Sequence, residues 1–102
     1  MLDKFPDEET GAKFDTGKPD YSILEKSFLD SVSYVLMHGE KKYGRDNWKK
    51  GLEFNRLFAA CCRHLFQYKD ESKTDSESGL NHLAHAACNI MFMIYLEKNK
   101  IE

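Results

Sequence analysis

Apolar side chains recur at helical spacing in three stretches of the chain, and these stretches predict an all-α fold. The first covers residues 25–38 and ends where Gly39 suits a helix C-terminus. The second covers residues 52–68 and the third covers residues 79–98. The predicted core-facing stripes consist of Phe28, Leu29, Val32, Val35 and Leu36 in the first helix and Phe54, Leu57, Phe58, Cys61, Leu65 and Tyr68 in the second. The pattern indicates a small bundle of three main helices.

The segments between these stretches carry the polar residues and most glycines. We expect residues 1–10 to be frayed or disordered, and residues 11–24 to form an irregular loop because they hold two glycines and a proline. Residues 39–51 form a basic, aromatic-bearing loop between glycines, and residues 69–78 contain no apolar side chain. No linker or repeat interrupts the chain, so residues 1–102 are predicted to form one helical domain.

The third predicted helix is apolar on nearly all sides, unlike the other two. Its apolar residues include Leu80, Leu83, Ala84, Ala87, Ile90, Met91, Ile94 and Leu96. A chain of 102 residues is too small to bury such a helix completely. We therefore expect the bundle to be completed by a homo-oligomer.

Composition excludes several classes of protein. The formal net charge is −2 and the pI is about 6.1, which argues against a general nucleic-acid binder. No stretch is apolar enough to cross a membrane, and the acidic N-terminus has no signal-peptide core. Cys61, Cys62 and Cys88 all fall in predicted helices, so we expect reduced thiols and a cytoplasmic location.

Polar residues in and before the third helix are the first candidates for chemistry. His82, His85 and Asn89 stand at i, i+3 and i+7 and therefore share one helix face. They need partners because unpaired burial is costly, and these partners are either a ligand or ordinary core hydrogen bonds. Asp75 and Glu77 precede the helix, where they suit either the helix dipole or a hard cation such as Mg²⁺.

Basic and aromatic residues in the two loops and the second helix form another candidate group. Lysine and arginine on constrained loops suit phosphate, and a neighbouring aromatic ring can stack on a base. Each such residue taken alone is more often solvated surface. The Gly17-Lys18 pair is not a Walker loop, because its glycine spacing is wrong and Pro19 follows. The residues concerned are Lys13, Asp15, Lys18, Lys42, Tyr43, Asn47, Trp48, Arg63 and His64.

Three blocks together resemble a known phage family. They are Gly-Ala-Lys-Phe-Asp-Thr-Gly-Lys-Pro at 11–19, the Gly-Glu-Lys-Lys-Tyr-Gly-Arg segment at 39–45 with its continuation to residue 48, and Glu-Ser-Gly-Leu-Asn-His-Leu-Ala-His-Ala-Ala-Cys-Asn at 77–89. This order resembles the phage dATP/dGTP diphosphohydrolase domain, a relative of the MazG-type all-α nucleoside triphosphate pyrophosphohydrolases. The resemblance covers residues 11–96. It implies an oligomeric enzyme, dependent on Mg²⁺ or Mn²⁺, in the host cytoplasm of a phage.

The resemblance also implies a reaction and residue roles. A purine deoxynucleoside triphosphate would be cut into monophosphate and pyrophosphate. Asp75, Glu77 and Asp30 would hold the metal, although Ser31 stands where the family often has a second acid. His82 or His85, with Asn89 in the same block, would serve catalysis. Substrate would be bound by Lys13, Asp15, Lys18, Lys42, Tyr43, Asn47, Trp48, Arg63 and His64.

Three other functions stay open at the level of sequence. The loss of an acid favours a non-catalytic protein that sequesters a nucleotide or a nucleotide-derived defence signal. Some phage proteins that resemble this family are nucleotide kinases without a Walker loop. A helical adaptor without any ligand would leave the basic loops as surface and the histidines as core.

Overall fold

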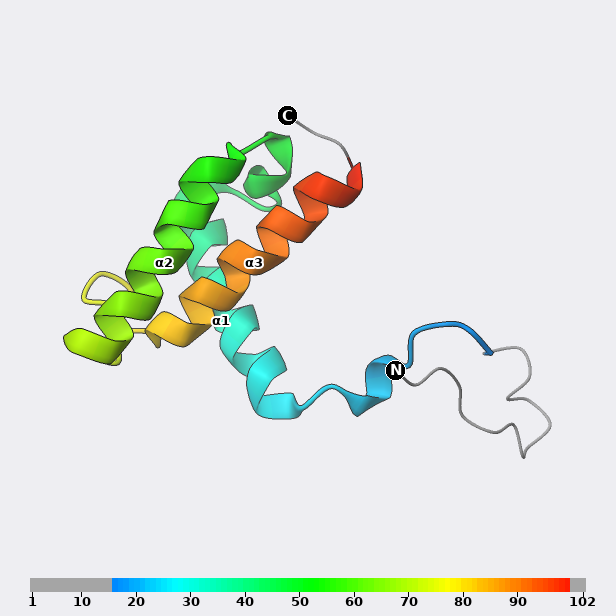
Figure 1. Ribbon diagram of the computed structural model, residues 1–102, viewed down its shortest axis with the longest axis horizontal. Coiled ribbons are helices and arrows are strands. Elements are labelled where there is room, and N and C mark those ends of the chain that lie inside the picture. Colours follow the sequence, from blue (N-terminus) through cyan, green and yellow to red (C-terminus); the bar gives the residue numbers. More distant parts are fainter. Residues whose placement is uncertain (1–15, 100–102) are drawn as a thin grey trace.

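The computed structural model describes residues 16–99, and the elements found there are all helical (Figure 1). Lys13, Asp15 and the segment expected to be frayed lie outside these residues. The 3₁₀ turn η2 (Tyr21–Ile23) precedes helix α1 (Lys26–Tyr43), and a second 3₁₀ turn, η3 (Asn47–Lys50), follows it. Helices α2 (Phe54–Asp70) and α3 (His82–Asn99) complete the fold. The prediction of an all-α bundle with three main helices is confirmed for the described part of the chain.

Helix α1 is longer than predicted, because Gly39 lies inside it and Gly44 ends it. The backbone of Gly44 has φ 94° and its N–H donates to the Glu40 carbonyl at 2.9 Å. Positive φ costs glycine little, whereas it strains other residues. Lys41 and Lys42 in the last turn also suit the negative end of the helix dipole. The extension places both lysines on a helix instead of in a loop.

Helix α3 begins at His82, three residues later than predicted. The preceding residues form a tight loop in which the Asp75 N–H donates to the Leu80 carbonyl at 2.8 Å and the Gly79 N–H donates to the Asp75 carbonyl at 2.8 Å. The His82 N–H donates at 2.8 Å to the Lys73 carbonyl, outside the helix. These bonds fix the loop at residues 71–81 against the start of α3.

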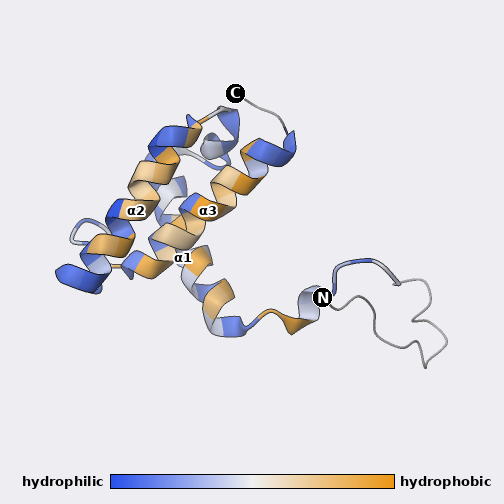
Figure 2. Ribbon diagram, viewed as in Figure 1, coloured by the Kyte–Doolittle hydropathy of each residue, from blue (hydrophilic) through white to orange (hydrophobic). Residues whose placement is uncertain are grey.

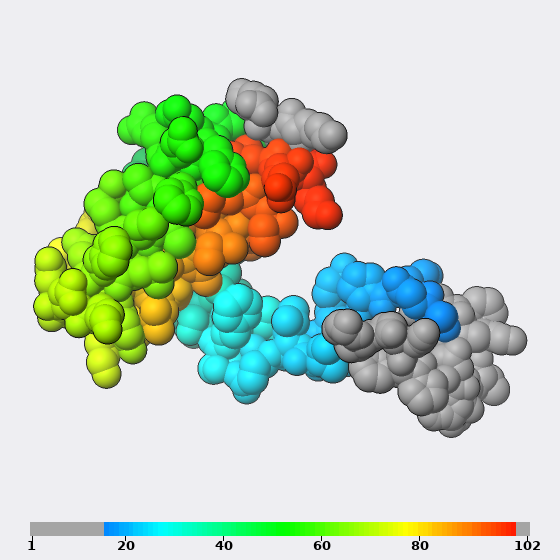
Figure 3. Space-filling view, viewed as in Figure 1, coloured from blue at the N-terminus to red at the C-terminus, as the bar shows by residue number. Residues whose placement is uncertain are grey.

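Helix α3 is the central element, because it packs against α1, α2 and η3 (Figure 1). Figure 3 shows α2 and α3 side by side along their length, while η2 and the start of α1 project from this body. Buried Val35, Ala84 and Cys88 join α1 to α3, and Leu57 and Cys61 are buried on α2. Small residues on α3 allow the neighbouring helices to approach closely. No described helix is apolar and long enough to cross a membrane.

Trp48 fastens the loop between α1 and α2 to the C-terminal half of α3. Its ring stacks on Phe92 with centroids 4.6 Å apart and meets Tyr95 edge-on at 5.0 Å. The Lys49 ammonium lies over the Trp48 ring at 5.4 Å and over the Tyr95 ring at 5.6 Å. Trp48, predicted as a partner for a base, is therefore first of all a packing residue.

Several residues of the predicted apolar stripes are exposed within the single chain. Leu57 and Cys61 of α2 are buried as expected, but the same predicted stripe includes exposed Phe54, Phe58 and Leu65. Figure 2 shows that apolar residues occur along much of α2 and α3. The stripe is wider than the area that α3 covers, so the prediction that all of it faces a core inside the chain is wrong.

We expect Trp48→Ala to lower the free energy of unfolding by about 2–3 kcal/mol, since it removes a large, partly buried ring at the junction of η3 and α3. Urea unfolding followed by circular dichroism measures the change. Tyr21→Ala is the control, since Tyr21 is 75% exposed and its loss should change the free energy by less than about 0.5 kcal/mol. Equal effects of the two substitutions would contradict the packing role.

Candidate metal centre and cleft

A cleft of about 1020 Å³ opens between the C-terminal half of α1, the loop that follows it, α2, the 71–81 loop and α3. Its volume matches that of small-molecule sites in proteins. Ten predicted site residues line it: Lys42, Tyr43, Asn47, Trp48, Arg63, His64, Asp75, Glu77, His85 and Asn89. The fold thus brings residues of the 39–48 and 77–89 blocks together with Arg63, His64 and Asp75, which lie between them in the sequence.

The 71–81 loop presents the Asp75 carboxylate to the cleft. Its Oδ2 accepts the backbone N–H groups of Glu77 at 3.1 Å and Ser78 at 2.9 Å. Partial burial acts to raise the pKa of Asp75, but the Ser78 N–H, the nearby His85 and the Glu77 N–H outweigh it and bring the pKa below its ordinary value of 3.8. Asp75 is therefore ionised at neutral pH.

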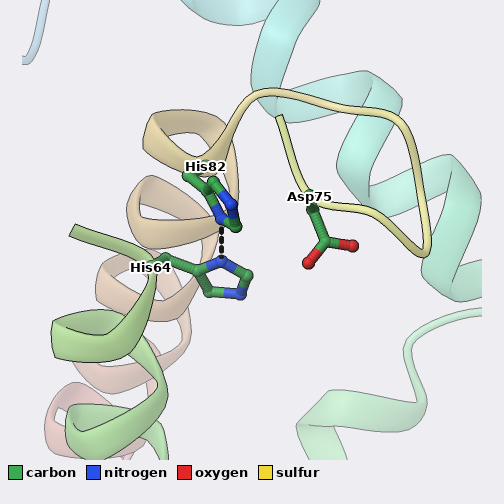
Figure 4. Close-up of side chains that lie close together, drawn as sticks. All are labelled: His64, Asp75 and His82. Atoms are coloured by element: carbon green, nitrogen blue, oxygen red, sulfur yellow. Dashed lines mark hydrogen bonds between the residues drawn. The ribbon is translucent and has the colours of Figure 1, made fainter. Parts of the chain in front are cut away.

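Three imidazoles gather beside this carboxylate. His64 of α2 and His82 of α3 face each other with their Nδ1 atoms 2.8 Å apart, as Figure 4 shows. One ring must donate a proton and the other accept it, so the two cannot both be protonated in this contact. His85 stacks on His64 with centroids 4.6 Å apart, and its Nε2 lies 2.7 Å from the Ser78 hydroxyl.

Burial keeps two of these imidazoles neutral. It lowers the pKa of His64 and of His85 below the ordinary value of 6.5, and in both cases a neighbouring histidine adds to the effect. The Asp75 carboxylate acts in the opposite direction on both groups without reversing the shift. A neutral imidazole is the form that binds a metal or accepts a proton.

His64, Asp75 and His82 can hold one metal ion. Each offers a ligand atom, and these atoms lie within 4.8 Å of one another (Figure 4). His82 is only 4% exposed, so its ring has little freedom to move. Two imidazoles with one carboxylate fit a first-row transition ion better than Mg²⁺, which prefers oxygen.

Three other predicted residues of the described part are not among the residues that line the cleft, and one of them is His82, which contacts the cleft residue His64. The Asp30 carboxylate, expected as a metal ligand, accepts from Lys26 at 2.7 Å near the start of α1, and Asp30 is not among the cleft residues. Lys18 is exposed before η2, also apart from the cleft. The third expected ligand, Glu77, does line the cleft, where its carboxylate forms an ion pair with Lys42. This pair raises the pKa of Lys42 and lowers that of Glu77.

Several residues that line the cleft were not predicted from the sequence, above all His38 and Arg56. His38 stands four residues before Lys42, and Arg56 stands seven before Arg63, so helical periodicity places each pair on one face. That periodicity was the available signal. Arg56 and Arg63 form no ion pair with another described residue, whereas Lys42 is paired.

We expect the protein to lose stability as pH falls from 7.5 to 5.5. The unfolded chain binds protons at His64 and His85 below about pH 6.5, whereas the lowered pKa values keep these groups unprotonated in the folded chain until the pH is lower. Their contribution to the free energy of unfolding is therefore complete above that pH and is lost on acidification. Melting temperature followed by circular dichroism measures this slope. The double variant His64→Gln/His85→Gln should flatten it, and Asn55→Gln on the exposed start of α2 should not; an unchanged slope in the double variant would contradict the assignment.

Comparisons with known proteins point to the same phage family that the three sequence blocks resemble. The family model described as dATP/dGTP diphosphohydrolase, N-terminal, matches residues 8–102. A dATP/dGTP diphosphohydrolase of Salmonella phage PMBT28 is 44% identical over 91 residues, which cover 89% of this chain and 31% of that protein. The chain thus spans about a third of the length of this relative, and no solved structure matches it. The chain belongs to the dATP/dGTP diphosphohydrolase family and corresponds to the N-terminal domain of that family.

Proposed function

We propose that this chain binds a purine deoxynucleoside triphosphate in the cleft and hydrolyses it, with a divalent ion, to a monophosphate and pyrophosphate. The observation that carries the proposal is the metal-binding group of His64, Asp75 and His82, two members of which, His64 and Asp75, line the cleft. Arg56 and Arg63 line the same cleft and have no ion-pair partner among the described residues. The phage relative, named as a dATP/dGTP diphosphohydrolase, supplies the substrate class.

Arg56 and Arg63 are the proposed phosphate contacts. Both line the cleft, stand on the same face of α2 and have no ion-pair partner among the described residues. One guanidinium group can donate two parallel hydrogen bonds to phosphate oxygens, and it remains charged at any working pH. Lys42 can contact phosphate only if its ion pair with Glu77 breaks, because that carboxylate already neutralises its charge.

The His64, Asp75 and His82 group would hold the ion, for which Mn²⁺ suits this mixed donor set better than Mg²⁺. The ion would supply positive charge next to the phosphates. His85 is the proposed base, because it lines the cleft, burial lowers its pKa and Ser78 fixes its ring. Water would attack the α-phosphorus, the bond to the bridging oxygen would break, pyrophosphate would leave, and His85 would take the proton from water.

Sequestration without cleavage is the second candidate function. The three-residue group suffices for one ion, and Asp30 forms its ion pair away from the cleft. Two-metal phosphoryl transfer needs further carboxylates to hold its second ion. This shortage favours a protein that holds a nucleotide, or a nucleotide-derived defence signal, intact. The three thiols, all free, suit the reducing cytoplasm of a phage-infected host.

We propose that a second copy of the chain packs against the exposed side of α3 in a homo-oligomer. Leu83, Ile90 and Ile94 stand at i, i+7 and i+11 and form one exposed apolar stripe. Exposed Phe58 and Leu65 lie on α2, the helix packed beside it. Contiguous apolar surface of this kind is typical of subunit interfaces.

We expect Asp75→Asn to lower pyrophosphate release from dGTP and dATP with Mn²⁺ by at least about 100-fold, because it removes a metal-binding charge. The amide oxygen can still accept the two loop N–H groups, so the fold should be retained. Asp70→Asn, at the exposed end of α2, is the matched control and should keep full activity. Ligand-induced melting shifts without products in the wild type would favour sequestration, and neither shifts nor products would overturn both candidates.

We expect Ile90→Lys to break the assembly of chains, since the charge would be buried at the proposed interface. Sedimentation velocity should show a wild type larger than the 11.9 kDa chain and a variant at that mass. Asn55→Lys adds the same charge on α2 and should leave the assembly intact. A wild type that sediments as a monomer would contradict the proposed interface.

A further inference from the structure

Asn89 is a buried polar residue whose side chain has no partner within residues 16–99. It is 9% exposed, lines the cleft, and its amide forms no hydrogen bond with another described residue. Every fully enclosed polar side-chain atom in the described part of the chain has a partner. The Asn89 amide atoms are therefore open to the cleft and not sealed in the core. An amide that faces a cleft without a protein partner is free to bind water or a ligand, so this position suits a polar ligand group.

The position of Asn89 along α3 indicates which part of a ligand it meets. The helical rise puts it about 6 Å beyond His85 and about 10 Å beyond His82, away from the metal group. Phe92 comes one turn later, lines the same cleft and carries the Trp48 ring. Asn89 thus stands between a charged end, which suits phosphates, and an aromatic end, which suits a base.

The carboxamide offers what a purine base requires. Its NH₂ group donates and its oxygen accepts, and asparagine binds the N6 and N7 positions of adenine in this way. Guanine presents the same N7 acceptor, whereas pyrimidines have none. The relative is named for both dATP and dGTP, so a contact common to the two bases is the one to expect.

We infer that Asn89 recognises the purine base, donating from Nδ2 to the N7 atom that adenine and guanine share. The inference rests on the proposed function and assigns to the nucleoside the part of the cleft beyond the metal group. It replaces the role in catalysis that the sequence resemblance implied for Asn89. Asn89 is then a specificity-determining residue, and His85 and the metal group act on the phosphates.

Calorimetric binding of α,β-methylene triphosphates in the presence of Mn²⁺ tests this without any turnover. The ligands are the analogues of dATP, of 7-deaza-dATP, which lacks the N7 acceptor, and of dCTP. The wild type should bind the dATP analogue about 10- to 100-fold more tightly than the 7-deaza analogue. Asn89→Ala should lose this difference by weakening only the dATP analogue. Asn55→Ala, at the exposed start of α2, should preserve it.

Asn89→Asp keeps the shape of the side chain but replaces the donor by an acceptor, so it should give the same loss if Asn89→Ala fails to fold. Equal weakening of all three ligands by either variant, or a wild type that does not distinguish dATP from 7-deaza-dATP, would overturn the inference. A wild type that binds none of the three would overturn the proposed function itself, and the two failures are therefore distinguishable.

Discussion

Three polar side chains lie on the largely apolar helix α3, and each of them needs a hydrogen-bonding partner. The rest of the structure depends on how this need is met. His82, His85 and Asn89 share one face of α3, which packs against α1 and α2, and none can be buried unpaired without a penalty. His82 meets His64 across the α2–α3 contact, and His85 meets Ser78 at the loop before the helix. Asn89 has neither kind of partner and faces the cleft. The polar face of α3 is thus satisfied by protein at its N-terminal end and open to a ligand further along.

The metal group depends on this arrangement because its donors come from three separate elements. His64 belongs to α2, His82 to α3, and Asp75 to the loop that joins them. The loop is held by its own backbone hydrogen bonds and by the bond from His82 to the Lys73 carbonyl, so the carboxylate is aimed before an ion binds. Such fixed donors lower the reorganisation that binding requires. Lys42 of α1 forms an ion pair with Glu77 of the same loop, and both residues line the cleft.

Helical periodicity was enough to predict the three helices and the shared face of His82, His85 and Asn89. Loop chemistry and the family resemblance added further residues, and ten of the predicted site residues line the cleft. Periodicity could not predict where Asp30 lies, because that residue precedes His38 by more than two turns of α1 and only the packing shows which end of α1 reaches the cleft. The His64–His82 contact joins positions 18 apart and depends on the pairing of α2 with α3. Apolar spacing also does not separate a face covered by the same chain from one left exposed, as Phe58 shows.

Paramagnetic broadening of backbone amide signals by Mn²⁺, with a non-hydrolysable dGTP analogue present, tests the central claim most directly. The claim is that one cleft takes both the ion and the nucleotide. Broadening should be strongest around Asp75, His64 and His82, and the nucleotide should shift signals around Arg63 and Asn89 in the same complex. Broadening centred on Asp30 or spread over exposed acids, or nucleotide shifts on another face of the molecule, would contradict it.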